Sequence, residues 1–281
     1  MDQIIQIAYL LAASSFILGL KFLSSPESAS RGMLLSQGGM FIAVVATLLN
    51  YGVVGYGLIL SGIVVGSAIG AVMAIKVQMT AMPQMVALLN GFGGLSSALV
   101  GVAEYLRSQP NLNPQAMLTI ALTVLIGMVT LTGSLVAFAK LQEWMRSGPL
   151  LFPFQQGLNL MFVLIALGLF AYLAVVPGAT PAFWVLVGLA SILGVLVVIR
   201  IGGGDMPVVI SLLTSYSGMA AAASGFVLSN TVLIISGALV GSAGLILSQL
   251  MCKAMNRSLS NVLFGGFGHV APTPRKPVAG V

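Results

Sequence analysis

Long apolar stretches are the feature that most constrains this chain. Nine of them are about 20 residues long, the length an α-helix needs to cross the hydrocarbon core of a bilayer. Only 6% of the 281 residues are charged, too few to cover the surface of a soluble protein of this size. The sequence therefore predicts an all-α fold, a polytopic membrane bundle of about nine transmembrane helices. The expected spans are residues 3–23, 32–50, 53–75, 84–106, 115–138, 157–176, 182–200, 207–228 and 231–252.

The positions of the basic residues predict the orientation of the bundle. When the connections between spans are taken alternately, ten of the 11 basic residues fall on one side and only Arg107 falls on the other. Connections rich in Lys and Arg remain in the cytoplasm, so the N-terminus is expected outside and the C-terminus inside. Orientation and lipid headgroups account for the net charge of +6, and no nucleic-acid partner is expected.

The C-terminal segment differs in composition from the rest. Residues 1–252 are expected to form the transmembrane domain, and residues 253–281 a cytoplasmic hinge or linker, because they begin basic and polar and end in a proline-rich stretch. Such a linker predicts a cytoplasmic domain that has been cut off or is supplied separately. Cys252 and His269 are the single cysteine and the single histidine, so neither an internal disulfide nor a metal site is expected.

Two acidic residues could have a function. Glu104 precedes Arg107 by three residues near the outer end of its span, which favours an interfacial ion pair over a proton entry site. Asp205 lies just before the span 207–228 and follows three glycines. It fits a helix-start acid that interacts with the helix dipole, and equally a docking or gating contact on a flexible loop. The three glycines are Gly202, Gly203 and Gly204.

Neutral polar residues follow helical spacing in two spans. Asn90 and Thr214 each lie seven residues after a proline, Pro83 or Pro207, which puts both about 10 Å along helices that start on the same side. Faces of this kind also pack membrane helices closely, and we favour packing for the serines, whereas a buried Asn is as often functional. The candidate pathway residues are Asn90, Ser97, Ser211, Thr214 and Ser217.

Two glycine stripes also predict close helix packing. Both have the small-residue spacing that lets membrane helices approach each other closely. The first consists of Gly62, Gly66 and Gly70, and the second of Gly237, Gly241 and Gly244.

Three long segments resemble a known family. They are VQMTAMPQMVALLNGFGGLSSALVG, GGGDMPVVISLLTSYSGMAAAASGFVLSN and ISGALVGSAGLILSQLMCKAMNRSLSNVLFGGFG. All three resemble the membrane domain of the beta subunit of bacterial proton-translocating NAD(P) transhydrogenase, and the resemblance extends through Gly268. It implies a domain of the bacterial inner membrane that couples proton translocation to hydride transfer between NADH and NADP⁺.

The resemblance also implies partners and cofactors. Alpha chains would bring the NAD(H) domain and further helices, an NADP(H)-binding domain would follow the linker, and alpha–beta units would form a homodimer. NADP(H) and NAD(H) would bind in the full complex. This chain alone is expected to bind neither and to catalyse no hydride transfer, because it has no soluble βαβ unit.

Site residues follow from the same resemblance. Asn90 stands where many members have a proton-carrying histidine, and Thr214 where many have an asparagine facing it. Both depart from the family pattern, so we expect an alpha-chain histidine at the depth of Asn90. Asp205 matches the acidic residue of the loop that communicates with the NADP(H) domain. Gly237, Gly241 and Gly244 match a close-packed glycine helix beside the channel, and Lys253 and Arg257 match the basic start of the hinge.

Two other classes of protein compete with this interpretation. A free-standing secondary transporter is supported by the similarity of the spans 84–106 and 207–228, but it would need a pocket lined by charged or aromatic residues. A purely structural membrane anchor would not need Asn90 and Thr214 at matching depths.

Overall fold

The fold is a bundle of membrane-length helices. The computed structural model describes residues 2–50, 56–109, 112–150, 154–176 and 178–264. Within these ranges there is no strand, and nine helices are long and apolar enough to cross a membrane, which confirms the predicted fold class. They are α1 (Asp2–Leu23), α2 (Ala29–Asn50), α3 (Tyr56–Lys76), α4 (Met82–Ser108), α5 (Pro114–Leu141), α6 (Gln155–Val175), α7 (Thr180–Ile199), α8 (Met206–Val227) and α9 (Thr231–Ala254).

Local sequence signals account for where several helices begin. Proline occupies one of the first two positions of α4, α5, α7 and α8, where its missing N–H costs no hydrogen bond. Asn230 caps α9 by accepting a hydrogen bond from the backbone N–H of Leu233 at 3.1 Å. Three short elements complete the described chain: η1 (Met79–Ala81), η2 (Gly203–Asp205) and α10 (Leu259–Phe264).

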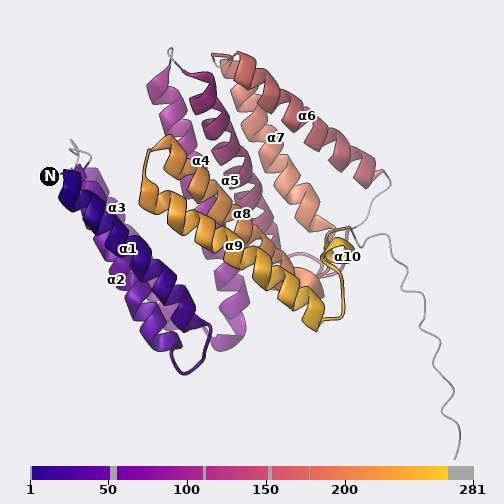
Figure 1. The fold of residues 1–281 in the computed structure, drawn as a ribbon. Coiled ribbons are helices and arrows are strands. Elements are labelled where there is room, and N and C mark those ends of the chain that lie inside the picture. The colour runs from indigo at the N-terminus through magenta and orange to yellow at the C-terminus, as the bar shows by residue number, and fades with distance from the viewer. Residues whose placement is uncertain (1, 51–55, 110–111, 151–153, 177, 265–281) are drawn as a thin grey trace, which may run out of the picture.

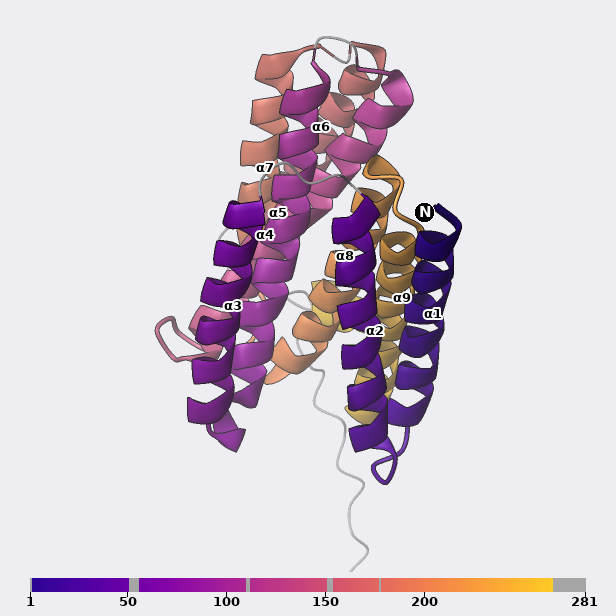
Figure 2. The same cartoon turned by 90° about the vertical axis from the view of Figure 1, so that its left-hand side faces the viewer.

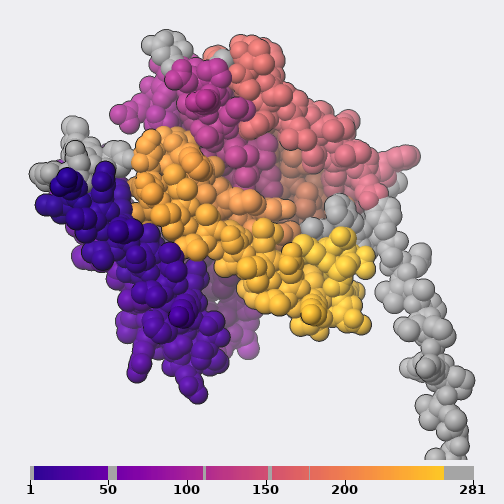
Figure 3. Space-filling model, viewed as in Figure 1, coloured from indigo at the N-terminus to yellow at the C-terminus, as the bar shows by residue number. Residues whose placement is uncertain are grey.

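Helix α5 is the centre of the bundle. It packs against α4, α6, α7 and α8, while α9 lies along α8 and the α1–α2 hairpin contacts α9 (Figure 1; Figure 2). In the space-filling view, α9 crosses this face between the α1–α2 hairpin and α6 (Figure 3). Helix α3 has no buried residue. The last turns of α1, α3, α5 and α9 each carry a lysine: Lys21, Lys76, Lys140 and Lys253. We call this end of the bundle the basic end.

Glycine allows two helix pairs to approach closely. A Cβ placed on Gly94 of α4 would lie 2.7 Å from the carbonyl oxygen of Gly127 on α5, so only hydrogen fits there. In the same way, a Cβ on Gly237 of α9 would lie 2.7 Å from the carbonyl oxygen of Gly218 on α8. Backbones held this close gain dispersion contacts that lipid chains cannot supply.

The buried core has two parts, one toward each end of the bundle. At the basic end, Val136 and Ala137 of α5 pack with Val198 of α7 and Met206 of α8. Toward the other end, Tyr105 of α4 stacks on Phe183 of α7, with ring centroids 3.8 Å apart. The first cluster positions the start of α8 and therefore the loop that carries Asp205.

Candidate functional site

A hydrogen-bonded cluster joins three helices around Asn90. The Asn90 amide Nδ2 on α4 donates to the hydroxyl of Ser134 on α5 at 3.0 Å. The hydroxyl of Ser217 on α8 lies 2.7 Å from Asn90 Oδ1 and can donate to it. Ser134 is 1% exposed and Asn90 is half-buried, so the cluster has a closed side and an accessible side.

Thr214 reaches this cluster by its backbone rather than by its hydroxyl. The Thr214 hydroxyl donates to the carbonyl oxygen of Ile210 in its own helix at 2.8 Å. The hydroxyl of Ser217 also lies 2.9 Å from the Thr214 carbonyl oxygen, so its one proton can serve either that oxygen or Asn90. The side chain that bonds Asn90 from α8 is therefore Ser217.

Ser134 is not among the candidate pathway residues that the sequence indicates. Helix α5 contains many hydroxyl residues, and no spacing distinguishes Ser134 from the rest. The hydroxyls of Thr123, Thr130 and Thr132 donate to carbonyl oxygens four residues earlier in α5. Only the packing of α4 on α5 shows that Ser134 bonds a side chain of another helix.

Ser97 and Ser211 lie outside the Asn90 cluster. Ser97 is buried seven residues further along α4, on the face with Gly94 and Gly101 that packs against α5. The Ser211 hydroxyl donates to the carbonyl oxygen of Gly244 on α9 at 3.0 Å. Cβ atoms placed on Gly237, Gly241 and Gly244 would all meet atoms of α8.

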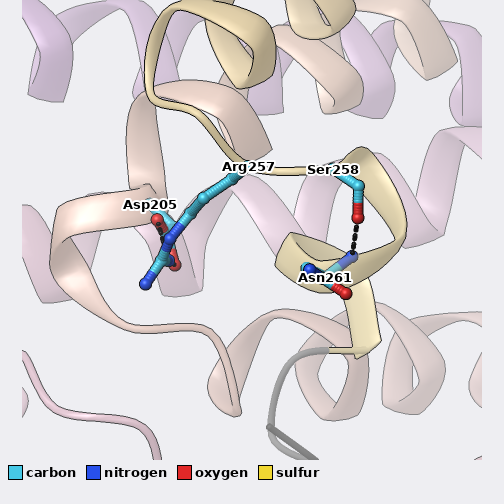
Figure 4. Close-up of polar contacts among 4 residues, drawn as sticks. All are labelled: Asp205, Arg257, Ser258 and Asn261. Atoms are coloured by element: carbon cyan, nitrogen blue, oxygen red, sulfur yellow. Dashed lines mark hydrogen bonds and ion pairs between the residues drawn. The ribbon is translucent and has the colours of Figure 1, made fainter. Parts of the chain in front are cut away.

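A loop at the basic end brings Asp205 and Arg257 together. Arg257 Nη1 lies 2.6 Å from Oδ2 and 2.8 Å from Oδ1 of Asp205 (Figure 4). The Asp205 side chain is 18% exposed and that of Arg257 46%. This ion pair joins the start of α8 to the segment that follows α9, while Lys253, in the last turn of α9, is exposed.

The three glycines before Asp205 differ in their surroundings. The Gly203 N–H donates to the carbonyl oxygen of Ser147 at 2.7 Å, which connects this loop to the segment between α5 and α6. A Cβ on Gly202 would lie 3.8 Å from Pro149 Cδ, whereas Gly204 is exposed and has room for one. The loop is therefore held at Gly203 and open at Gly204.

Comparison with known proteins assigns the chain to a family. The family model described as NAD(P) transhydrogenase beta subunit matches residues 5–279. The chain belongs to this family. It is 45% identical over 268 residues to the protein named NAD(P) transhydrogenase subunit beta in Rhodospirillum rubrum, and the same values hold for a named strain of that species. The match covers 93% of this chain but 58% of those relatives.

Glu104 of this transhydrogenase family member does not belong to the hydrogen-bonded Asn90 cluster. Glu104 accepts a hydrogen bond from the Ser108 hydroxyl at 2.8 Å, and it forms no ion pair with the exposed Arg107. The sequence-based expectation of an ion pair was wrong: the partner of the Glu104 carboxylate is Ser108, one turn later in the helix. His269 lies outside the described residues, and the described part of the chain contains no group of three or more His, Cys, Asp or Glu that could hold a metal ion.

Proposed function

We propose that this chain is the proton-translocating membrane part of an NAD(P) transhydrogenase. It would couple proton translocation to hydride transfer between NADH and NADP⁺ in the bacterial inner membrane. The observation that carries the proposal is the cluster of Asn90, Ser134 and Ser217, which joins three helices in a member of this family.

This cluster can conduct protons only with help from a titratable group. An amide or a hydroxyl has no pKa near neutrality, but each both donates and accepts hydrogen bonds. The cluster can therefore hold water molecules and orient a titrating side chain. Histidine is the natural choice because its pKa lies near neutrality, and we propose that an alpha-chain helix supplies it.

The surface around Asn90 supports a partner on this side. The preceding residue, Leu89, is 54% exposed, and Val86, one turn earlier than Asn90, is 49% exposed. This apolar face of α4 either contacts lipid or packs against another membrane helix. A helix placed there would bring its own side chains to the accessible side of Asn90.

The Asp205–Arg257 pair is the proposed coupling contact. It lies at the basic end, which the positive-inside rule assigns to the cytoplasm, and it links α8 to the start of residues 253–281. We propose that these residues form the hinge to an NADP(H)-binding domain, and that the loop with Gly202, Gly203 and Gly204 contacts that domain. The proposed complex contains alpha subunits and a homodimer of alpha–beta units, with NADP(H) and NAD(H) bound outside this chain.

Reconstitution of the assembled enzyme in proteoliposomes tests the proposal. Protons translocated and hydride transferred are measured together for the wild type, Asn90→Leu and Asn90→His, and after removal of the alpha-chain histidine. Asn90→Leu and histidine removal should both abolish coupled turnover, whereas Asn90→His should restore part of it when the alpha-chain histidine is absent. Ser242→Ala is the matched control, because that exposed hydroxyl bonds only the carbonyl oxygen of Ala238 in its own helix.

Two results would contradict the proposal. One is normal proton coupling in Asn90→Leu, and the other is the absence of any titratable alpha-chain side chain at the depth of Asn90. The isolated chain provides a separate check, because we expect calorimetry to detect no binding of NADP(H) or NAD(H) and assays to detect no hydride transfer.

A further inference from the structure

Lys140 is a buried cation at the end of a membrane helix. It lies in the last turn of α5 and is 1% exposed. Its Nζ donates to the carbonyl oxygens of Ile199 and Ile201, the latter at 2.8 Å, and lies 3.5 Å from the carbonyl oxygen of Gly148. An ammonium group has three N–H donors, so each has an acceptor. No described carboxylate lies within ion-pair distance of this lysine.

These acceptors belong to two connections at the basic end. Ile199 is the last residue of α7, where free carbonyl oxygens and the helix dipole favour a cation. Ile201 is 3% exposed and leads directly into Gly202, while Gly148 belongs to the segment between α5 and α6. Lys140 therefore links α5 by hydrogen bonds to the beginning of the loop that carries Asp205.

Lys140 is more deeply buried than a lysine needs to be if it only sets the orientation of the protein in the membrane. A lysine that only sets topology can remain in water, as the exposed Lys76 does at the end of α3. Removing a charge from water is costly unless hydrogen bonds compensate for the lost hydration. The three carbonyl oxygens around Lys140 provide that compensation, so its placement serves the loop.

The same helix contacts the Asn90 cluster. Ser134, which bonds Asn90, lies six residues before Lys140 on α5, about 9 Å along the helix axis. Near the same end of α5, Gln84 of α4 donates to the carbonyl oxygen of Leu141 at 2.8 Å. One rigid helix thus contacts the Asn90 cluster at Ser134 and the Asp205 loop at Lys140.

We propose that Lys140 is a positioning residue that fixes the register of the Asp205 loop against α5. A displacement of the loop would then move α5 and change the contact between Ser134 and Asn90. The loop is held at Ile201 by Lys140 and at Gly203 by Ser147, two residues before Asp205. This inference rests on the proposed function, because it assigns the loop to proton coupling.

The test uses the assembled alpha–beta transhydrogenase in proteoliposomes. Lys140→Met removes all three donors, Lys140→Gln keeps a shorter neutral donor, and Lys140→Arg keeps the cation. We expect Lys140→Met and Lys140→Gln to lower the number of protons translocated per hydride, because the loop is then no longer held at Ile201 by a charged donor. Lys140→Arg should recover much of the loss, and the exposed control Lys76→Met should behave as the wild type.

A spin label on the loop provides a second readout. Gly204→Cys is suitable because that position is exposed and has no atom within 4 Å of a Cβ, whereas the native Cys252 is buried. In Lys140→Met the label should become more mobile than in the wild-type background. The exposed control Lys76→Met should leave the label as mobile as in the wild-type background.

The outcomes separate this inference from the proposed function. If the reconstituted wild type translocates no protons, the proposed function fails and this inference fails with it. If the wild type is coupled and both neutral variants keep its proton-to-hydride ratio, the role of Lys140 alone is overturned. Failure of both neutral variants to accumulate in the membrane would also overturn it, because Lys140 would then be a folding residue.

Discussion

Arg257 and Asp205 are 52 residues apart in the sequence, yet their side chains form an ion pair with a shortest N–O distance of 2.6 Å. The pair connects the residue before α8 with the segment that follows α9, the two helices that pack through Gly218 and Gly237. Any force on the chain after α9 therefore reaches the start of α8 by a direct contact.

The Asp205–Arg257 pair should matter more for coupling than for stability. Partly exposed ion pairs contribute about 0–1 kcal/mol, and nearly half of the Arg257 side chain is exposed. Asp205→Asn should therefore have little effect on the midpoint temperature of thermal unfolding of the chain. It should lower the coupled turnover of the assembled enzyme. Unfolding in detergent and turnover in proteoliposomes measure the two effects. Wild-type coupled rates in Asp205→Asn would reduce this residue to a helix-start acid.

Asn90 and Ser134 should be energetically coupled. Their hydrogen bond joins α4 to α5, and bonds between membrane helices average about 0.6 kcal/mol in double-mutant cycles. A cycle of Asn90→Leu and Ser134→Ala, followed by unfolding in detergent, should give an interaction energy of about that size. The control pair, Asn90→Leu with Ser242→Ala, should be additive, because Ser242 bonds only its own helix. Additivity in both cycles would contradict the observed bond.

The α8–α9 glycine contact should not tolerate a methyl group. In Gly237→Ala the new Cβ would meet the backbone of α8, so the helices must separate, and overpacking of this kind costs about 1–3 kcal/mol. Gly62→Ala on α3 is the matched control, since a Cβ there has no atom within 4 Å. The midpoint temperature of thermal unfolding of the isolated chain in detergent should fall for Gly237→Ala only. Equal stability of the two variants would show that α8 and α9 are less tightly packed.

The orientation of the bundle is open to direct measurement. Reporter fusions after Ser28, Lys140 and Lys253 should report the cytoplasm, and fusions after Asn50 and Pro177 the outside, because basic connections remain inside. An outside signal at Lys253 would require an even number of spans and would contradict the nine-span topology.

Much of the fold was predictable because the membrane constrains it so strongly. A segment of about 20 apolar residues has to be a helix, since hydrocarbon satisfies no backbone polar group. The prolines that begin α4, α5, α7 and α8 helped to set the boundaries. Asn90 could be selected for the same reason, because an amide is costly to bury among apolar side chains.

Partners across helices were less predictable. Thr214 was expected to face Asn90, but the side chain that does so is Ser217, less than one helical turn further along α8. Depth along a helix follows from counting residues, whereas rotation about its axis depends on how neighbouring helices pack. Ser134 and Lys140 were missed for this reason, because their bonding partners lie on other helices or loops.

The sequence by itself determined the number of spans and the residues costly to bury, because these depend on the transfer of each segment from water into hydrocarbon. Tertiary structure decided which faces meet. Both glycine stripes have the spacing for close packing. Of these six glycines, Gly237, Gly241 and Gly244 meet another helix, while Cβ atoms on Gly62, Gly66 and Gly70 would have no neighbour within 4 Å. Because lipid chains are themselves apolar, a glycine stripe can face lipid at little cost, so only the contacts between helices distinguish the two stripes.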